Sequence, residues 1–150
     1  SEYDTSTKLN EVDRDRPLSQ QVALLRSPPE HHHPLIAALV RSVDRAGATH
    51  GYEITSGSIG ISMSRLWKGE VAMHVLTSGR ETPWDSTPII GMAERLGLVW
   101  LRPSPDGTRL VPWHPEPPTD SYQRDFDVVV APASVAAELD RWCAANSLAG

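Results

Sequence analysis

Cysteine and long apolar runs are scarce in this chain of 150 residues. The single cysteine, Cys143, excludes an intramolecular disulfide. No apolar run approaches the roughly 18 residues that a membrane-spanning helix needs, and the first residues lack the pattern of a signal peptide. We therefore expect a cytoplasmic protein that has no membrane partner.

Positive charge is also scarce. The chain has 14 Lys and Arg against 19 Asp and Glu, which gives a net charge of −5, and no segment is strongly basic. Nonspecific affinity for nucleic acid depends on basic side chains that displace counterions from phosphates, so this composition disfavours a nucleic-acid partner. Twelve of the basic residues are Arg, a skew that fits a bacterial genome rich in G·C pairs.

The length and the polarity of the chain predict its organisation. Residues 1–17 are polar and have no hydrophobic period, and we interpret them as an N-terminal arm. Residues 18–150 are predicted to be a single domain. Because the chain does not begin with Met, we expect it to be part of a larger protein or assembly. The arm could add contact area on a second copy, so we consider either a protein partner or a homodimer.

Four segments have the hydrophobic period and the end signals of helices. Pro34 suits the first turn of the second segment, and Gly47 suits its end. Thr87 and Pro88 suit the start of the third, and Ser134 can cap the fourth. The predicted helices cover residues 19–26, 34–46, 87–96 and 134–143.

Other segments have the pattern of strands. Ile59, Ile61 and Met63 alternate with small residues, which predicts a half-buried strand over residues 52–63. Residues 64–78 fit either a strand after a turn at Lys68-Gly69 or a helix, and we favour the strand because glycine is costly inside a helix. Residues 126–131 are predicted to form a short apolar strand.

A hairpin is predicted directly after the third helix, with strands over residues 98–102 and 108–112. Pro105, Asp106 and Gly107 have turn-forming character between them. The whole segment 92–113 resembles the recognition-helix end and the wing of MarR-type winged-helix regulators. The matching residues are Leu96, Gly97, Leu98, Val99, Pro105, Asp106 and Arg109.

That resemblance implies a winged-helix DNA-binding regulator in which Arg95, Arg102 and Arg109 contact DNA. The preceding helix argues against base reading, because it offers little beyond Gly91, Glu94 and Arg95 on its outer face. We predict an α+β fold of small antiparallel hairpins packed by helices, winged-helix-like around residues 86–113.

No catalytic residue, metal site or cofactor is predicted. Adjacent histidines seldom reach one metal ion, so residues 31–33 are expected to form an exposed polar loop. Cys143 lies late in its helix among alanines and is expected in the core. The carboxylate pairs are expected in solvated loops rather than in a catalytic cleft; they are Asp13 with Asp15 and Asp125 with Asp127.

Tryptophan is frequent relative to phenylalanine, with five against one. Because Trp and Arg often anchor interfaces, we predict an interaction surface; its residues are Trp84, Trp100, Arg102, Arg109 and Trp113. The favoured function is a non-catalytic protein-interaction or regulatory module rather than an enzyme. The alternatives are the DNA-binding regulator and a small ligand-binding or enzymatic domain with a pocket between Trp67, Trp84 and His74.

Overall fold

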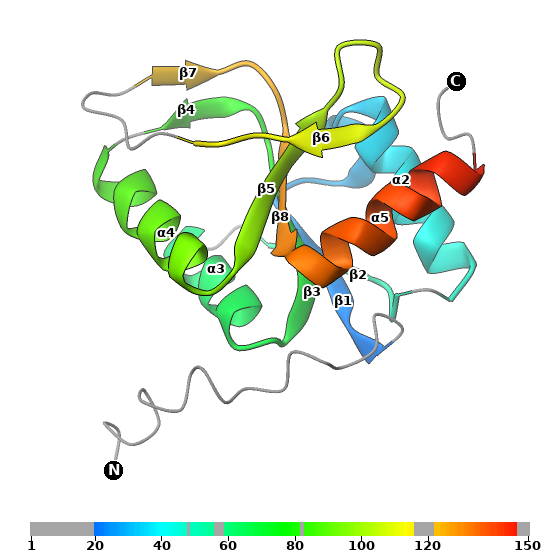
Figure 1. Ribbon diagram of the computed structural model, residues 1–150, viewed down its shortest axis with the longest axis horizontal. Coiled ribbons are helices and arrows are strands. Elements are labelled where there is room, and N and C mark those ends of the chain that lie inside the picture. The colour runs from blue at the N-terminus through cyan, green and yellow to red at the C-terminus, as the bar shows by residue number, and fades with distance from the viewer. Residues whose placement is uncertain (1–19, 48, 56–58, 82, 116–121, 147–150) are drawn as a thin grey trace.

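The computed structural model describes residues 20–47, 49–55, 59–81, 83–115 and 122–146. Within them, four α-helices cover the two faces of a six-stranded mixed sheet (Figure 1). The strand order is β2-β1-β3-β8-β5-β6, and β4 and β7 form a separate two-stranded sheet. The prediction of a mixed α+β fold is confirmed.

The elements have the following bounds. The strands are β1 Val22–Leu25, β2 Tyr52–Ile54, β3 Val71–Leu76, β4 Gly79–Glu81, β5 Leu98–Pro103, β6 Leu110–Pro112, β7 Tyr122–Arg124 and β8 Val128–Pro132. The helices are the 3-10 turn η3 Pro29–His31, and α2 Pro34–Arg45, α3 Ile59–Trp67, α4 Pro83–Arg95 and α5 Ala133–Asn146.

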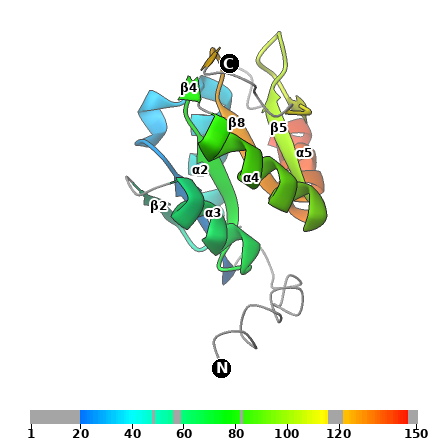
Figure 2. The ribbon, with the colours of Figure 1, turned by 90° about the vertical axis from the view of Figure 1, so that its left-hand side faces the viewer.

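The sheet has a parallel part and an antiparallel part. β1 pairs in parallel with both β2 and β3, and the connections that join these strands contain α2 and α3. From β3 onward the neighbours β8, β5 and β6 are antiparallel. In Figure 1, α3 and α4 lie to the left of the strands and α2 and α5 to the right, so the fold has three layers. Figure 2 looks onto α3 and α4 with the sheet behind them.

Two apolar cores result, one on each face of the sheet. Strand β8 shows the alternation: Val129 and Ala131 pack with α2 and α5, whereas Val128 and Val130 pack with α3 and α4. Because helices cover both faces, all six residues of β3 are buried, and all but His74 are apolar.

Two predicted elements are wrong. Residues 22–25 form strand β1 rather than part of a helix, because a short apolar run buried on both faces has no period that distinguishes strand from helix. Residues 59–63 are helical rather than extended. Ser62, Met63 and Leu66 are the buried positions of α3, and Ile61 is 67% exposed, so the apparent alternation was accidental.

The segment 64–78 combines both interpretations that the sequence left open. Leu66 and Trp67 belong to α3, Gly69 reverses the chain with φ +74°, and β3 follows as the favoured strand. Helix α4 begins at Pro83 rather than near Thr87, so Pro83 takes the first helical position that we assigned to Pro88.

Helix α2, helix α5, strand β8 and the hairpin β5–β6 agree with the sequence-based elements to within a few residues. The structure does not confirm a winged helix, because the hairpin forms the edge of the six-stranded sheet and β5 also pairs with β8. Residues 1–17 lie outside the described residues, and the single domain over 18–150 stays a prediction. No helix in the described ranges is long and apolar enough to cross a membrane.

Candidate functional site

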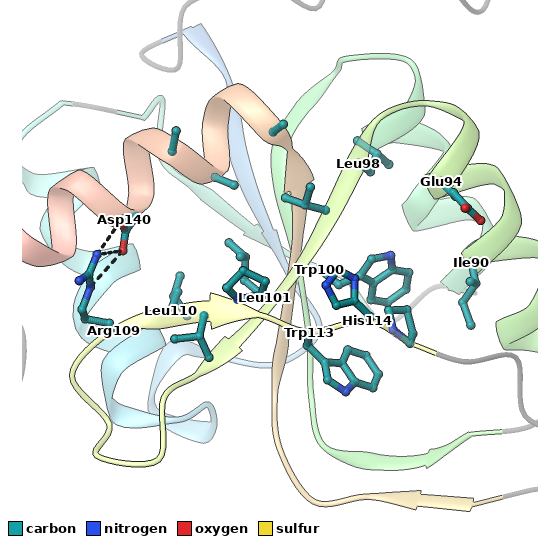
Figure 3. Close-up of a pocket in the computed structure, with 17 residues that line it drawn as sticks. Ile90, Glu94, Leu98, Trp100, Leu101, Arg109, Leu110, Trp113, His114 and Asp140 are labelled. Carbon is teal, nitrogen blue, oxygen red and sulfur yellow. Dashed lines mark hydrogen bonds and ion pairs between the residues drawn. The ribbon is translucent and has the colours of Figure 1, made fainter.

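A cavity of about 940 Å³ lies at the β5–β6 edge of the sheet, between α4 and α5 (Figure 3). Its walls come from α4, β5, β6, the residues that follow β6, and α5. The lining residues are Ile90, Glu94, Leu98, Val99, Trp100, Leu101, Arg109, Leu110, Val111, Pro112, Trp113, His114, Pro115, Ala133, Ala136, Ala137 and Asp140. Most of them are apolar, with a few polar groups among them.

Local sequence explains why space is left at this edge. Strand β6 pairs with only the last three residues of β5, from Leu101 to Pro103, so the first half of β5 borders the cavity. On the opposite wall, α5 presents Ala133, Ala136 and Ala137. An alanine has no side chain beyond Cβ, so this part of α5 cannot fill the gap to the strands.

Aromatic rings form one end of the cavity. The rings of Trp100 and Trp113 meet edge to face, with their centroids 6.1 Å apart and their planes at 73°. Trp113 in turn meets Phe126 at 5.2 Å. The guanidinium carbon of Arg102 lies 3.7 Å from the centre of the Phe126 ring, a cation–π contact.

An ion pair closes the other end, as Figure 3 shows. The Arg109 guanidinium donates from Nη2 to both carboxylate oxygens of Asp140, at 2.7 and 2.6 Å, and from Nε at 3.2 Å. The hydrogen bonds and the negative charge of Asp140 raise the pKa of Arg109. The ion pair ties the hairpin to α5.

The predicted interaction residues are divided by the structure. Trp100, Trp113 and Arg109 line the cavity, whereas Arg102 does not and contacts Phe126. Arg102 and Arg109 thus lie on opposite faces of the sheet, because Phe126 packs with the α3–α4 core and Asp140 belongs to α5. Trp84 lies in the first turn of α4, and its side chain is outside the described part of the chain.

The other predicted DNA-contacting residue, Arg95, is exposed at the end of α4 and does not line the cavity. Sequence reasoning missed Ile90, Glu94, His114 and Asp140 as neighbours of the tryptophans. The spaced alanines of α5 were a usable signal for a gap. Nothing local to the sequence indicated which strand the gap would face.

The hairpin turn confirms the predicted Pro105-Asp106-Gly107 signal. Asp106 accepts hydrogen bonds from the Ser104 hydroxyl at 2.5 Å and from the Thr108 hydroxyl at 2.8 Å. The bonds from Ser104 and then Thr108 lower the pKa of Asp106. Gly107 adopts φ +73°, which suits glycine. The residue that resembled a wing tip therefore organises the turn itself.

A buried polar cluster lies where β1 and β3 end. Asp127 accepts hydrogen bonds from the backbone N–H groups of His33 at 2.6 Å and Ser78 at 2.7 Å, and its Oδ2 lies 3.3 Å from Nδ1 of His32. Burial raises the pKa of Asp127, but the hydrogen bonds from His32, His33 and Ser78 outweigh it, so the pKa is lowered. Arg124 joins the same cluster by donating to the carbonyl oxygens of Thr77 and Phe126.

This cluster corrects two sequence-based predictions. His32 is buried and not part of an exposed loop, although its neighbour His31 is exposed. Asp127 is also buried rather than solvated, whereas Asp125 is exposed as expected. Asp13 and Asp15 lie outside the described residues. Cys143 is buried in the core, and burial raises the pKa of its thiol.

His74 is fully buried at the centre of β3, with Nδ1 at 3.3 Å from the sulfur of Met63. Burial, and then electrostatic interactions with Arg26 and His32, lower the pKa of His74 to about 3. Neither His74 nor Trp67 lines the cavity, and the side chain of Trp84, the third residue of the predicted pocket, lies outside the described part of the chain. Among the described residues, no three His, Cys, Asp or Glu side chains come together that could hold a metal ion.

No family model and no curated protein matches this sequence. The fold is similar to solved structures. The crystal structure of inositol monophosphatase II from Staphylococcus aureus MSSA476 matches with a TM-score of 0.51 and 10% identity, over 86% of this chain and 41% of that chain. Inositol monophosphate-bound SaIMPase-II matches with a TM-score of 0.50 and 12% identity, over 86% and 42%. This chain therefore spans about two fifths of the solved chains.

These likenesses correct the favoured function. The prediction of a non-catalytic interaction or regulatory module, with a winged-helix DNA-binding regulator as its alternative, is wrong, because the chain has a fold that solved enzymes use. The favoured module depended on the lack of a catalytic pattern and on the frequent Trp and Arg residues, and its DNA-binding alternative depended on a helix and hairpin that looked like a wing. The hairpin is instead part of the six-stranded sheet.

Proposed function

We propose that this chain is a small-molecule-binding domain whose site is the cavity at the β5–β6 edge. The observation that carries the proposal is the cavity itself. Ligand sites in proteins are concave, of about 300–1,000 Å³, mostly apolar, and contain a few polar groups that orient the ligand. A cavity of about 940 Å³ walled by Leu98, Leu101, Leu110 and the α5 alanines, with Glu94 and Asp140 at its margins, meets each of these conditions.

The fold gives a second line of support. One of the similar structures has inositol monophosphate bound, so a similar fold holds a small molecule in that protein. A sequence identity of 12% supports a similar fold and does not identify a ligand for this chain. The nature of this chain's ligand is therefore argued from its own side chains.

The test uses a neutral fluorescent probe of apolar sites, Nile red. We expect the wild-type protein to bind it with a blue shift and increased emission. Ala137→Trp fills the cavity from α5 and should weaken binding at least about tenfold, a loss of about 1.4 kcal/mol. Ala144→Trp is the matched control, since Ala144 is exposed on the same helix and does not line the cavity. Equal binding by both variants would contradict the proposal.

A second candidate function is hydrolysis of a small phosphate monoester, which the fold shared with two phosphatase structures favours. In α/β sheets, ligands commonly bind outside the carboxyl ends of the parallel strands. Here that place is the end of β1 and β3, near Asp127, and not the cavity.

The two candidates are separable by experiment. Phosphate release from inositol monophosphate should be measured with and without added divalent cations. If hydrolysis occurs at the strand ends, wild type and Ala137→Trp should release phosphate at equal rates, because the substitution fills a cavity elsewhere. Release no faster than in preparations from cells without the expression plasmid would reject this candidate.

A further inference from the structure

The negative side chains that line the cavity outnumber the positive ones, and this excess determines which ligands the cavity can bind. Arg109 and Asp140 neutralise each other through three hydrogen bonds. Glu94 also lines the cavity and forms no ion pair with any other described residue. The three side chains together carry one net negative charge. An anionic ligand would meet this charge and would have to displace Asp140 to reach Arg109.

The Glu94 carboxylate, which forms no ion pair with any other described residue, lies at the end of the cavity that the tryptophan rings form. In Figure 3, Glu94 and Ile90 extend from α4 on the side of the cavity where Trp100, Trp113 and His114 gather, and Arg109 and Asp140 lie at the far end. Ile90 and Glu94 are four residues apart, so they share one face of the helix. A carboxylate and tryptophan rings therefore border the same part of the cavity.

Aromatic faces and a nearby carboxylate attract organic cations. A positive charge over a tryptophan face is favoured by the ring's charge distribution, and aromatic cages bind quaternary ammonium groups in this way. Trp100 and Trp113 stand at 73° to each other and so form two walls of a corner. The same aromatic cluster already accepts a cation elsewhere, since Arg102 lies over Phe126.

We propose that the cavity binds an organic ammonium ligand, with its cationic group between Trp100, Trp113 and Glu94 on the α3–α4 side of the sheet. Its apolar body passes around the part of β5 that β6 does not cover and reaches the α5 alanines on the other side. This inference rests on the proposed ligand-binding function and names the class of ligand. A hydrophobic body suits the apolar walls, and the cationic group matches the charge of Glu94. The far ion pair limits the length of the ligand.

The test compares three ligands of nearly one shape: 3-hydroxyphenyltrimethylammonium, the neutral 3-tert-butylphenol, and the anionic 3-hydroxybenzenesulfonate. Calorimetry gives the Kd of each, and NMR shifts of the indole N–H groups locate the binding. Glu94→Gln should raise the Kd of the ammonium about threefold to tenfold and leave that of the phenol unchanged. Trp100→Leu should weaken binding of the ammonium more than binding of the phenol.

Glu138→Gln is the control, because Glu138 is an exposed carboxylate on α5 that does not line the cavity. It should change none of the three affinities. If Glu94→Gln weakens binding of the ammonium and of the phenol equally, or changes neither affinity, the proposed preference for an ammonium ligand is wrong. If the phenol still binds and Ala137→Trp abolishes its binding, the proposed function survives that result. If no ligand binds at the cavity, both proposals fail.

Discussion

At the scale of single residues, the buried polar groups have the largest effects. His74 is an imidazole in an apolar layer, and among the described residues its Nε2 has no hydrogen-bond partner. A buried imidazole without a partner for its charge stays neutral, which is the physical meaning of its pKa of about 3. The residue therefore couples the stability of the fold to pH.

The first prediction concerns acid stability. The unfolded chain takes up a proton at His74 below its ordinary pKa of 6.5, whereas the folded chain does so only near 3. Stability should therefore fall as the pH drops from 6.5 toward 3. At pH 4.5, two pH units below the unfolded value, the penalty is about 3 kcal/mol. His74→Leu should remove this penalty, measured by urea unfolding at pH 7 and pH 4.5.

His50→Gln is the matched control, because His50 is exposed. The control should keep the wild-type difference in unfolding free energy between the two pH values. An unchanged pH dependence in His74→Leu would mean that His74 is not the buried neutral group that the structure shows.

At the scale of elements, glycine has opposite effects at two positions near the end of α4. Gly91 lies inside the helix, and a Cβ there would meet no atom within 4 Å. Gly97 follows the helix with φ +71°, in a conformation that L-residues rarely adopt. The space at both sites is open, so only the backbone conformation distinguishes them.

The second prediction uses this pair. Gly91→Ala should raise the free energy of unfolding by about 0.5–1 kcal/mol, because alanine favours the helical state. Gly97→Ala should lower it by about 1–2 kcal/mol, because Cβ strains the left-handed conformation. Thermal unfolding of the two variants beside wild type measures the signs. If both variants changed the free energy of unfolding in the same direction, α4 would not end where the structure places its end.

Whether an element was predictable depended on how local its signal is. Helix α2 was found because Pro34 at the start, Gly47 at the end and the apolar face lie within one short segment. Helix α3 was missed because Ile61 is exposed, and only the packing of Met63 and Leu66 distinguishes the buried face. The turn residues were enough to predict the hairpin, but they did not indicate that the hairpin forms the edge of a larger sheet.

At the scale of the whole molecule, we expect local stability to be graded across the sheet. Strand β3 lies between β1 and β8, with apolar layers on both faces. The outer strand β2 has three exposed residues, and β6 is short and at the opposite edge. Local opening of such edges costs less free energy than opening of the centre.

The third prediction follows from this arrangement. In native-state hydrogen exchange, amides of β3 and β8 should exchange slowest, near the rate that global unfolding allows, and amides of β2 and β6 should exchange fastest among the strands. Equal protection across all six strands would mean that the edges open only with the core. An ammonium ligand should slow exchange selectively at β5 and β6.

The sequence by itself determined the features that depend on neighbours in the chain: helices α2 and α5, the Asp106-Gly107 turn with its hairpin, the apolar strand β8 and the lack of basic segments. Periodicity, capping and a positive φ act over a few residues, so they can be seen in the sequence. Tertiary structure alone decided that residues 22–25 are a strand, that Asp127 meets His32 across 95 positions, and that Trp100 shares a cavity with Glu94. These depend on which distant segments cover each face of the sheet, because burial and hydrogen-bond partners are properties of the packed chain.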